Sequence, residues 1–306
     1  MSLYAMLKSN GHSGFGYGST ADDVVRDLDL SGKTILLTGC NSGIGTAALH
    51  AFTSRGATVV ATARTEDKAR EAGVGTRGGR LIPVACELSE PASVRAAVQS
   101  VRERAPLLDA IVCNAGIMAL PKLELKHGLE LQFLTNHVGH FMLVTGLLDR
   151  LTPSGRVVML SSDAHRAAPP DGIDFDNLDG SRGYNGWTAY GRSKLANLLF
   201  AKGLARRFQG SARVANAVHP GVIHTNLSRH MNPLANVAFA MAKPLALKNI
   251  GQGAATEVWA AVHPAAATVN GQYLSDCNIA KPRRRAEDAA LAERLWTETE
   301  RLVARL

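Results

Sequence analysis

A tyrosine and a lysine stand four positions apart in the segment Tyr190-Gly191-Arg192-Ser193-Lys194. Positions i and i+4 lie on one face of an α-helix, so the Lys194 ammonium can lie near the Tyr190 phenol. A free tyrosine has a pKa near ~10, and a neighbouring cation favours its phenolate. The spacing therefore predicts a pair that gives a proton to, or takes one from, the oxygen of a small molecule.

Two adjacent serines follow the apolar run at residues 157–160. This run predicts a buried strand, and α/β proteins bind ligands at the carboxyl ends of such strands. Ser161 and Ser162 therefore compete as the group that orients a substrate oxygen. Asn136 is a further candidate for the catalytic site. Asparagine is disfavoured inside a helix, so its presence there suggests a local role. A buried amide satisfied by backbone groups is the alternative.

A glycine-rich turn follows the predicted strand at residues 33–38, and a predicted helix follows the turn. In such a turn one glycine permits the tight bend, one lets the backbone approach a pyrophosphate, and one allows close helix–strand packing. The free N–H groups and the dipole of the helix favour an anion at its N-terminus. The residues predicted to hold a dinucleotide here are Gly39, Asn41, Ser42, Gly43, Ile44 and Gly45.

The end of the second predicted strand indicates which dinucleotide is bound. An acidic residue there would bind both ribose hydroxyls and repel a 2′-phosphate, but the sequence has Ala63 followed by Arg64. An arginine can hold a phosphate through two parallel charge-assisted bonds, and Lys68 lies one helical turn further on. These residues predict NADP(H); a merely solvated Arg64 is the alternative.

Short apolar segments alternate with longer amphipathic ones from residue 32 onward. This alternation is typical of βαβ units. It predicts a single α/β domain at residues 31–306, a Rossmann-type doubly wound parallel sheet of about seven strands, after an N-terminal extension at residues 1–30. Predicted strands cover residues 33–38, 58–62, 81–85, 110–113, 157–160, 214–218 and 272–274, and predicted helices cover 47–55, 91–104, 128–150, 189–208 and 286–306.

Taken together, these segments resemble the short-chain dehydrogenase/reductase family. The turn has the form TGxxxGIG and the tyrosine–lysine pair the form YxxxK, in the order found in that family. The resemblance implies that Tyr190 transfers the proton and that Lys194 supports it, both also contacting the cofactor. It further implies that Ser162 rather than Ser161 orients the substrate oxygen, and that Asn136 holds a water in the proton relay.

Three further segments match parts of the family that lie along the dinucleotide. Two depart from the pattern, since Glu87 replaces an aspartate and Cys113 replaces the first asparagine of an NNAG element. A PGxxxT element after the sixth predicted strand matches the part near the nicotinamide. The cofactor contacts implied by these matches are Glu87, Leu88, Asn114, Ala115, Gly116, Pro220, Gly221, Val222 and Thr225.

Within the family the chain is most similar to the branch of retinol dehydrogenases and WW-domain-containing oxidoreductases. The similarity is carried by the segments at residues 18–20, 161–165, 190–197, 216–221 and 252–256. The sequence has no WW domain and no run of ~18 apolar residues that would indicate a membrane helix. We therefore expect neither a membrane anchor nor membrane-bound retinoid metabolism.

The segment from residue 224 to about 250 is predicted to be a substrate lid. It is apolar, it contains Pro233 and Pro244, which interrupt helices, and residues 224–248 include no acid. Such a lid would exclude water and favour lipophilic substrates. The alternative is an ordinary packed helix pair.

Composition limits the partners and the compartment. The chain has 306 residues, 46 % hydrophobic and 20 % charged, and four scattered cysteines, which predict a soluble cytoplasmic protein with reduced, buried thiols. The net charge of +8 forms no basic stripe with interleaved aromatics, so no nucleic acid is expected. No His/Cys cluster has metal-ligand spacing, so no metal is expected, and His137, His140 and His165 are interpreted as packing or surface residues.

The resemblance implies a homodimer or homotetramer formed by the helices at residues 128–150 and 189–208.

The predicted function is transfer of a hydride between NADP(H) and a carbonyl or alcohol, with a lipophilic aldehyde, ketone or alcohol as substrate. The alternative is a catalytically idle dinucleotide sensor or scaffold on the same fold. A sensor would not need all four of Asn136, Ser162, Tyr190 and Lys194, so the sequence favours the enzyme. Specificity depends on the shape of the pocket, so the pattern does not name the substrate.

Overall fold

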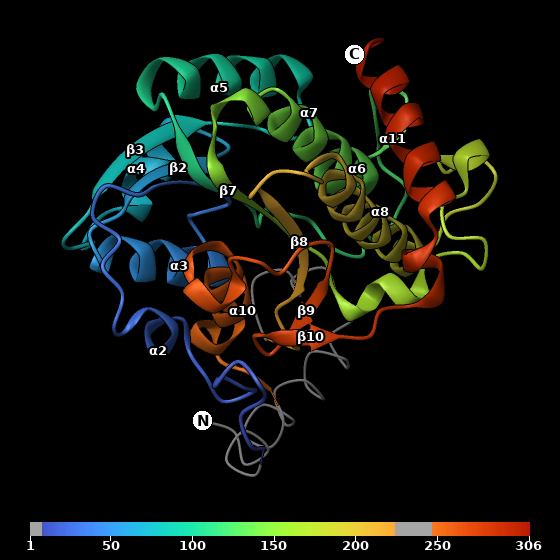
Figure 1. The fold of residues 1–306 in the computed structure, drawn as a ribbon. Coiled ribbons are helices and arrows are strands. Elements are labelled where there is room, and N and C mark those ends of the chain that lie inside the picture. The colour runs from blue at the N-terminus through green and yellow to red at the C-terminus, as the bar shows by residue number, and fades with distance from the viewer. Residues whose placement is uncertain (1–7, 224–246) are drawn as a thin grey trace.

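The computed structural model describes residues 8–223 and 247–306. A single eight-stranded sheet runs through the middle of this part of the chain (Figure 1), in the order β10-β9-β8-β7-β4-β1-β2-β3. All neighbouring strands are parallel except β9 and β10. The predicted α/β fold is confirmed. The strands are β1 Thr34–Thr38, β2 Thr58–Ala63, β3 Arg80–Ala85, β4 Leu108–Cys113, β7 Leu151–Leu160, β8 Val214–His219, β9 Tyr273–Ser275 and β10 Asn278–Ala280.

The eighth strand, β10, is not among the seven predicted ones. It pairs antiparallel with β9 through a two-residue turn at Asp276 and Cys277, whose φ angles are 53° and 60°. Such left-handed turns usually carry Asn-Gly or Asp-Gly, and the strand has only three residues. The sequence therefore has neither the usual turn residues nor enough alternation to indicate a hairpin.

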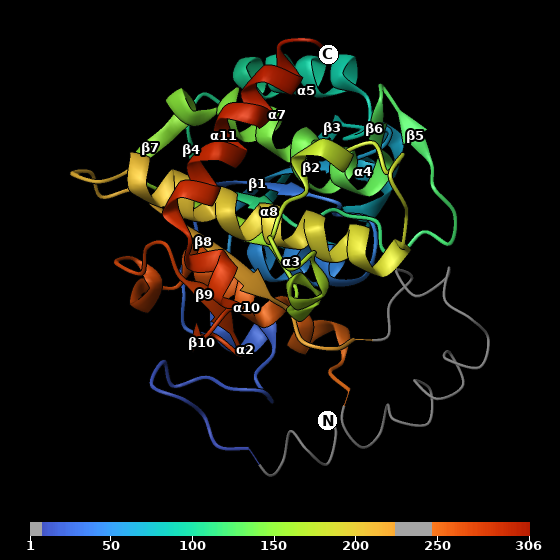
Figure 2. The same ribbon diagram turned by 90° about the vertical axis from the view of Figure 1, so that its right-hand side faces the viewer.

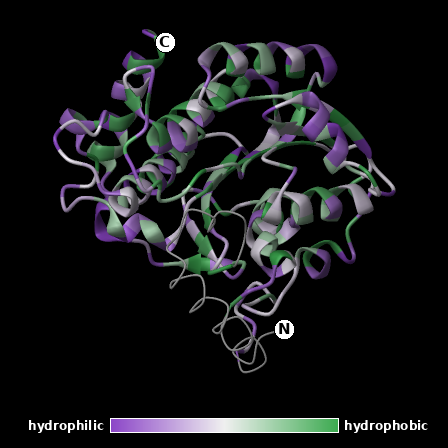
Figure 3. Ribbon diagram, turned by 180° about the vertical axis from the view of Figure 1, so that it is seen from behind, coloured by the Kyte–Doolittle hydropathy of each residue, from purple (hydrophilic) through white to green (hydrophobic). Residues whose placement is uncertain are grey.

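Helices cover both faces of the sheet, as the two views in Figures 1 and 2 show. One face carries α5 Pro91–Arg104, α6 Leu131–Phe133, α7 Gly139–Thr145, α8 Gly186–Arg207 and α11 Ala289–Val303. The other carries α2 Ala21–Val25, α3 Gly43–Ser54 and α10 Ile250–Val262, while α4 Glu66–Ala72 packs on β2 and β3. Figure 3 shows the apolar strands between helices whose outer sides are polar. Alternate residues of one strand therefore enter different cores, Leu36 one and Leu37 the other.

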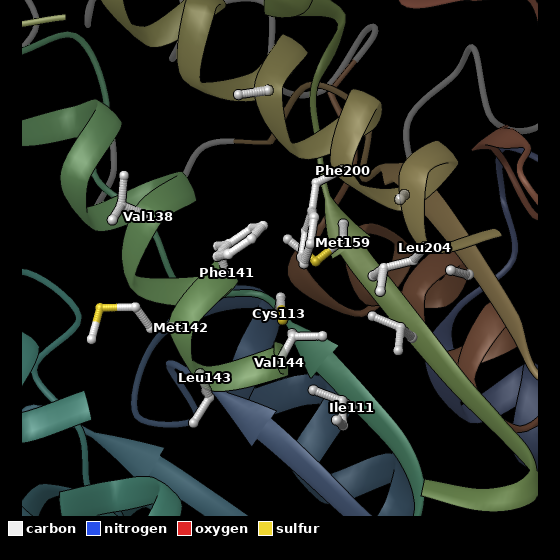
Figure 4. Close-up of a cluster of buried hydrophobic side chains, with 14 of the residues drawn as sticks. Ile111, Cys113, Val138, Phe141, Met142, Leu143, Val144, Met159, Phe200 and Leu204 are labelled. Carbon is white, nitrogen blue, oxygen red and sulfur yellow. The ribbon is translucent and has the colours of Figure 1, made fainter. Parts of the chain in front are cut away.

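Aromatic side chains form the centre of the core beneath α7 and α8. Figure 4 shows Phe141 and Phe200 beside Met159, and their ring centroids are 5.0 Å apart. Trp296 of α11 packs against both phenylalanine rings, at 5.1 and 5.3 Å. The last helix therefore completes this core instead of lying loosely on it.

The single helix predicted at residues 128–150 is wrong in its details. A hairpin of β5 Leu125–Lys126 and β6 Leu129–Glu130 comes first, and its turn uses Gly128 at φ 74°. The Glu130 carboxylate then accepts hydrogen bonds from the first N–H groups of α6. A π-helical turn, Leu134–Val138, separates α6 from α7. Isolated π-turns are common at functional sites, and this one contains Asn136.

The segment at residues 8–30 is attached to the domain through α2 and Gly18. Thr20 and Asp23 cap each other across the start of α2, and α2 packs against α10 and α3. The Gln252 side chain of α10 donates a hydrogen bond of 3.1 Å to the Gly18 carbonyl. All four cysteines are buried and free, as predicted.

Candidate active site

The predicted proton-transfer pair lies on α8, where the helix passes the carboxyl ends of β7 and β8. Asn185 begins this helix by accepting hydrogen bonds from the N–H groups of Trp187 and Thr188, each at 3.0 Å. Tyr190 and Lys194 follow on one face, and both are buried. The Lys194 Nζ is 5.5 Å from the centre of the Tyr190 ring. The helical spacing seen in the sequence therefore does bring the two groups together.

The two serines after β7 have different partners. The Ser162 side chain lies near enough to the Tyr190 phenol to lower its pKa, and its Oγ accepts from the Ala164 N–H at 3.2 Å. The Ser161 hydroxyl instead donates to the main-chain carbonyl of Lys194, at 2.8 Å. Of the two serines, Ser162 is therefore the one whose side chain lies beside the Tyr190 phenol.

Burial governs the protonation of this pair. It raises the pKa of Tyr190, and the nearby Ser162 side chain offsets that rise only in part. Burial also lowers the pKa of Lys194 to about 8, and its ammonium donates to the Leu160 carbonyl at 3.0 Å. The expected stabilisation of a phenolate by the lysine is therefore not the dominant effect here. The phenol keeps its proton, which is the state of a proton donor.

The Asn136 amide is fully engaged by the protein. Its Oδ1 accepts from the Ile117 N–H at 2.9 Å, and its Nδ2 donates to the Ile117 carbonyl and to the Ser193 hydroxyl, each at 2.9 Å. This matches the alternative considered for the sequence, a buried amide satisfied largely by backbone. A Cβ on Gly116 would lie 3.0 Å from Asn136 Oδ1 and 3.4 Å from Lys194 Nζ. Asn136 thus joins the loop after β4 to α8 immediately beside Lys194.

The glycine-rich turn forms an open cradle at the N-terminus of α3. Gly39 and Gly43 have φ angles of 69° and 53°, which glycine adopts without strain. A Cβ on Gly45 would overlap the Gly39 carbonyl oxygen, so the helix packs tightly on the turn. Asn41 and Ser42 are exposed, and the Ser42 side chain does not cap the helix. The first N–H groups of α3 are therefore open to an anion.

The predicted phosphate-binding side chains are exposed beside this cradle. Arg64 follows β2 directly, and Lys68 lies in the first turn of α4. Across residues 8–223 and 247–306, no ion pair or hydrogen bond engages either of their charged groups. Glu66, an acid in the first turn of α4, is paired with Arg70 at 2.9 Å. Both cations are thus available to a ligand.

The other predicted cofactor residues stabilise the strand ends. Asn114 Nδ2 donates to the Thr38 carbonyl at 2.8 Å, and the Ala115 N–H donates to the Thr38 hydroxyl at 3.0 Å. Glu87 accepts from the Ser89 N–H and hydroxyl, at 3.1 and 3.0 Å, so its carboxylate holds its own loop. Leu88, next in the chain, is buried.

The loop after β8 contains the last predicted contacts. Pro220 is partly exposed, Gly221 has φ 88°, and Val222 is exposed. The Lys248 side chain crosses Gly221 so closely that a Cβ there would lie 2.6 Å from its Cδ. Thr225 and almost all of the predicted lid at residues 224–250 lie outside the described residues.

Neither a metal site nor a membrane span is found in the described parts of the chain. There, no group of three His, Cys, Asp or Glu side chains could hold a metal ion. No helix among these residues has both the length and the apolarity needed to cross a bilayer.

Comparison with known proteins agrees with this geometry. The family model described as short chain dehydrogenase matches residues 33–174. A Brassica napus protein, short-chain dehydrogenase TIC 32 B, chloroplastic, is 38 % identical over 99 % of this chain and 99 % of its own length. This chain belongs to the short-chain dehydrogenase family. The resemblance to its retinol dehydrogenase branch is also confirmed, since human retinol dehydrogenase 14 is 36 % identical over 90 % of this chain and 88 % of its own.

Solved structures extend the similarity to the fold. An uncharacterized protein from Mycobacterium paratuberculosis superposes with a TM-score of 0.75, at 32 % identity, over 94 % of this chain and 97 % of its own. A short chain dehydrogenase from Burkholderia cenocepacia, solved in complex with NADP, superposes with a TM-score of 0.66 at 26 % identity, over 81 % and 97 %.

Sequence reasoning missed two residues of this short-chain dehydrogenase, Thr38 and His140. His140 Nδ1 lies 2.9 Å from the Asn136 main-chain oxygen, and because a carbonyl only accepts, this nitrogen must donate. Burial lowers the pKa of His140 to about 4, so the ring is neutral and Nε2 accepts from the Thr38 hydroxyl at 2.9 Å. The histidine therefore links the end of β1 to the main chain of Asn136. The only signal for it in the sequence is its position four residues after Asn136, and that pattern predicts no more than a packing or surface residue.

Replacing His140 with phenylalanine should lower the free energy of unfolding by ~1–3 kcal/mol, because the buried Asn136 carbonyl and Thr38 hydroxyl lose their partner. Urea unfolding would measure this, with Thr38→Val as the matched change at the other end of the link. Because both substitutions break the same bond, their effects should be less than additive. If the double variant lost the full sum of the two single losses, the Thr38 hydroxyl and His140 would not be contributing through a shared hydrogen bond.

Proposed function

We propose that this protein is an NADPH-dependent carbonyl reductase of lipophilic aldehydes or ketones, and that it also catalyses the reverse alcohol oxidation. The observation that carries the proposal is the buried phenol of Tyr190, whose pKa burial raises, with the Ser162 side chain and the Lys194 ammonium beside it. A neutral phenol is the form that can give a proton to a carbonyl oxygen as charge develops on it.

The residues around the cradle fit a nicotinamide dinucleotide. The N-terminus of α3, between Gly39 and Gly45, would hold the pyrophosphate, and Arg64 with Lys68 would hold a 2′-phosphate. The loops at residues 114–116 and 220–222 would line the path towards Tyr190. When bound, the reduced nicotinamide would supply a hydride to the carbonyl carbon.

The chain's own groups then act on the carbonyl oxygen. Ser162 Oγ orients that oxygen by a hydrogen bond, and Tyr190 Oη donates its proton to it. The positively charged Lys194, buried 5.5 Å from the ring, stabilises the phenolate that remains until it is reprotonated. Since burial lowers the pKa of Lys194 to about 8, this support weakens as the pH rises through that value.

A dinucleotide sensor on the same fold is the second candidate. It would bind NADPH through the same cradle but would have no need for the Ser162–Tyr190 contact. NADPH oxidation, followed at several aldehyde and ketone concentrations, separates the two functions. NADPH binding without oxidation across a panel of straight-chain, branched and aromatic carbonyls would favour the sensor.

Arg64→Ala should remove most of a preference for NADPH over NADH. A charge-assisted hydrogen bond contributes ~1.5–3 kcal/mol, so the preference in the unmutated protein should be roughly 10- to 150-fold. Calorimetric titration with each dinucleotide measures it directly. Arg70→Ala is the matched control, because that arginine lies on the same helix but is paired with Glu66. Tighter binding of NADH than NADPH by the unmutated protein would contradict the assignment.

A monomer is proposed as the active form. The resemblance implies that the helices at residues 128–150 and 189–208 pair between subunits in a homodimer or homotetramer. Here α11 of the same chain packs on α8 and, through Trp296, on Phe141 of α7. Arg207 of α8 binds Glu293 through two bonds of 2.8 and 3.1 Å and stacks 3.6 Å over Trp296. His137, in the π-turn before α7, is hydrogen-bonded to Thr299 at 3.0 Å.

A cytoplasmic location stays a prediction.

A further inference from the structure

Trp187 differs from the other two tryptophans described in the structure. Trp259 and Trp296 have exposed fractions of 3 % and 7 %, whereas Trp187 keeps 46 % of its surface exposed. It lies in the first turn of α8, three positions before Tyr190. A large aromatic group left in water forgoes a substantial hydrophobic stabilisation. Its placement beside the reacting phenol gives it a surface that a ligand can cover.

The indole lies directly against the catalytic phenol. The centroids of the Trp187 and Tyr190 rings are 6.3 Å apart, with the planes at 79° in an edge-to-face arrangement. The Lys194 ammonium lies 5.5 Å from the centre of the same phenol. Tyr190 itself is buried, so the exposed indole is the aromatic surface next to it that meets solvent. A substrate whose oxygen reaches Tyr190 would therefore pass the indole with the rest of its carbon skeleton.

The backbone that carries Trp187 is held in place independently of its side chain. Its N–H donates to Asn185 at 3.0 Å, and the carbonyl of the preceding Gly186 accepts from Gln132 Nε2 at 3.2 Å. A Cβ on Gly186 would overlap the Leu120 carbonyl oxygen, so the helix start packs against the loop after β4. The indole thus projects from a rigid support, which lowers the entropy cost of binding a ligand on it.

We propose that Trp187 is a specificity-determining residue whose indole contacts the apolar part of the substrate, selecting carbonyl compounds that carry a long alkyl chain or an aromatic ring. This deepens the proposed function and rests on it. Each substrate methylene that leaves water to contact the indole should raise kcat/KM roughly two- to fourfold. The rate therefore grows with each added carbon. Small polar carbonyls reach the phenol without using the indole.

Kinetics across an aldehyde series test this directly. In the unmutated protein, kcat/KM with NADPH should rise from propanal through hexanal to octanal, and should be high for 2-naphthaldehyde. Trp187→Ala should lower kcat/KM for octanal and 2-naphthaldehyde by about 10-fold or more, leave propanal within about twofold, and leave the Kd for NADPH unchanged. Trp187→Phe should fall between the two. Val74→Ala, at another exposed apolar side chain, is the control and should match the unmutated protein.

A binding measurement keeps this inference distinguishable from the proposed reaction. Octanamide presents a carbonyl and an alkyl chain but is not reduced, so calorimetric titration in the presence of NADP⁺ reports contact alone. Weaker octanamide binding by Trp187→Ala supports the inference even if no aldehyde is reduced, in which case only the reductase proposal fails. If aldehydes are reduced but the variant changes all of them by the same factor, or none, the inference is overturned. Unchanged octanamide affinity overturns it as well.

Discussion

Tyr190→Phe should lower kcat for carbonyl reduction by ~10²–10⁴-fold, because it removes the proton donor and leaves the ring in place. The phenylalanine keeps the contacts of the ring with Trp187 and with the Lys194 ammonium, so the fold and the cofactor site should be unaffected. Steady-state kinetics with NADPH and a reactive aldehyde measure the loss, and calorimetry should return an unchanged Kd for NADPH.

Tyr184→Phe is the matched control for that experiment. The Tyr184 hydroxyl donates to the Leu120 carbonyl at 2.9 Å and receives a bond from Gln132, so it supports the start of α8 without facing the substrate oxygen. Its loss should cost less than about one order of magnitude in kcat. Turnover near that of the unmutated protein in Tyr190→Phe would remove Tyr190 from the chemistry, whatever Tyr184→Phe does.

Features that depend on local spacing could be predicted from the sequence. The tyrosine–lysine pair lies on one helical face because the helix repeat requires it, and the glycine turn after β1 follows from steric limits on the backbone. The strands that alternate with helices followed from hydrophobic periodicity. These features agree with the structure because neighbouring residues alone decide them.

Features that depend on distant partners could not be predicted. Thr38 and His140 are separated by 102 positions, and nothing in either segment indicates that they bond. The pKa of Tyr190 depends on burial by the whole domain, which outweighs the nearby lysine. The residues alone leave Ser161 and Ser162 open and only the family resemblance favours Ser162; the physical difference is the hydrogen bond that Ser161 makes with the carbonyl of Lys194, 33 positions away. In each case tertiary packing, and not spacing, determines the role of the side chain.

Glu257 is a second case in which burial decides the charge of a side chain. It lies on α10 with an exposed fraction of 1 %, and neither carboxylate oxygen has a hydrogen-bond partner among the described residues. Burial without a partner disfavours the charged form, and it raises the pKa of Glu257 to about 8. The folded protein therefore holds this proton between pH 4.5 and about 8, whereas the unfolded chain releases it near pH 4.5.

Replacing Glu257 with glutamine should make the protein more stable at pH 8 but not at pH 5. Because the folded state binds the proton more tightly, the unmutated protein loses stability as the pH rises through this window, and the loss stops above the folded pKa. A pKa change from 4.5 to about 8 predicts a loss of roughly 3–4 kcal/mol between pH 5 and pH 8, a large part of a typical domain's stability. Glutamine has nearly the same shape and no charge at either pH, so the variant should not show this loss.

Urea unfolding of both proteins at the two pH values gives the difference, with the exposed Glu71→Gln as the control. An equal difference in stability between Glu257→Gln and the unmutated protein at both pH values would mean that Glu257 is not held neutral.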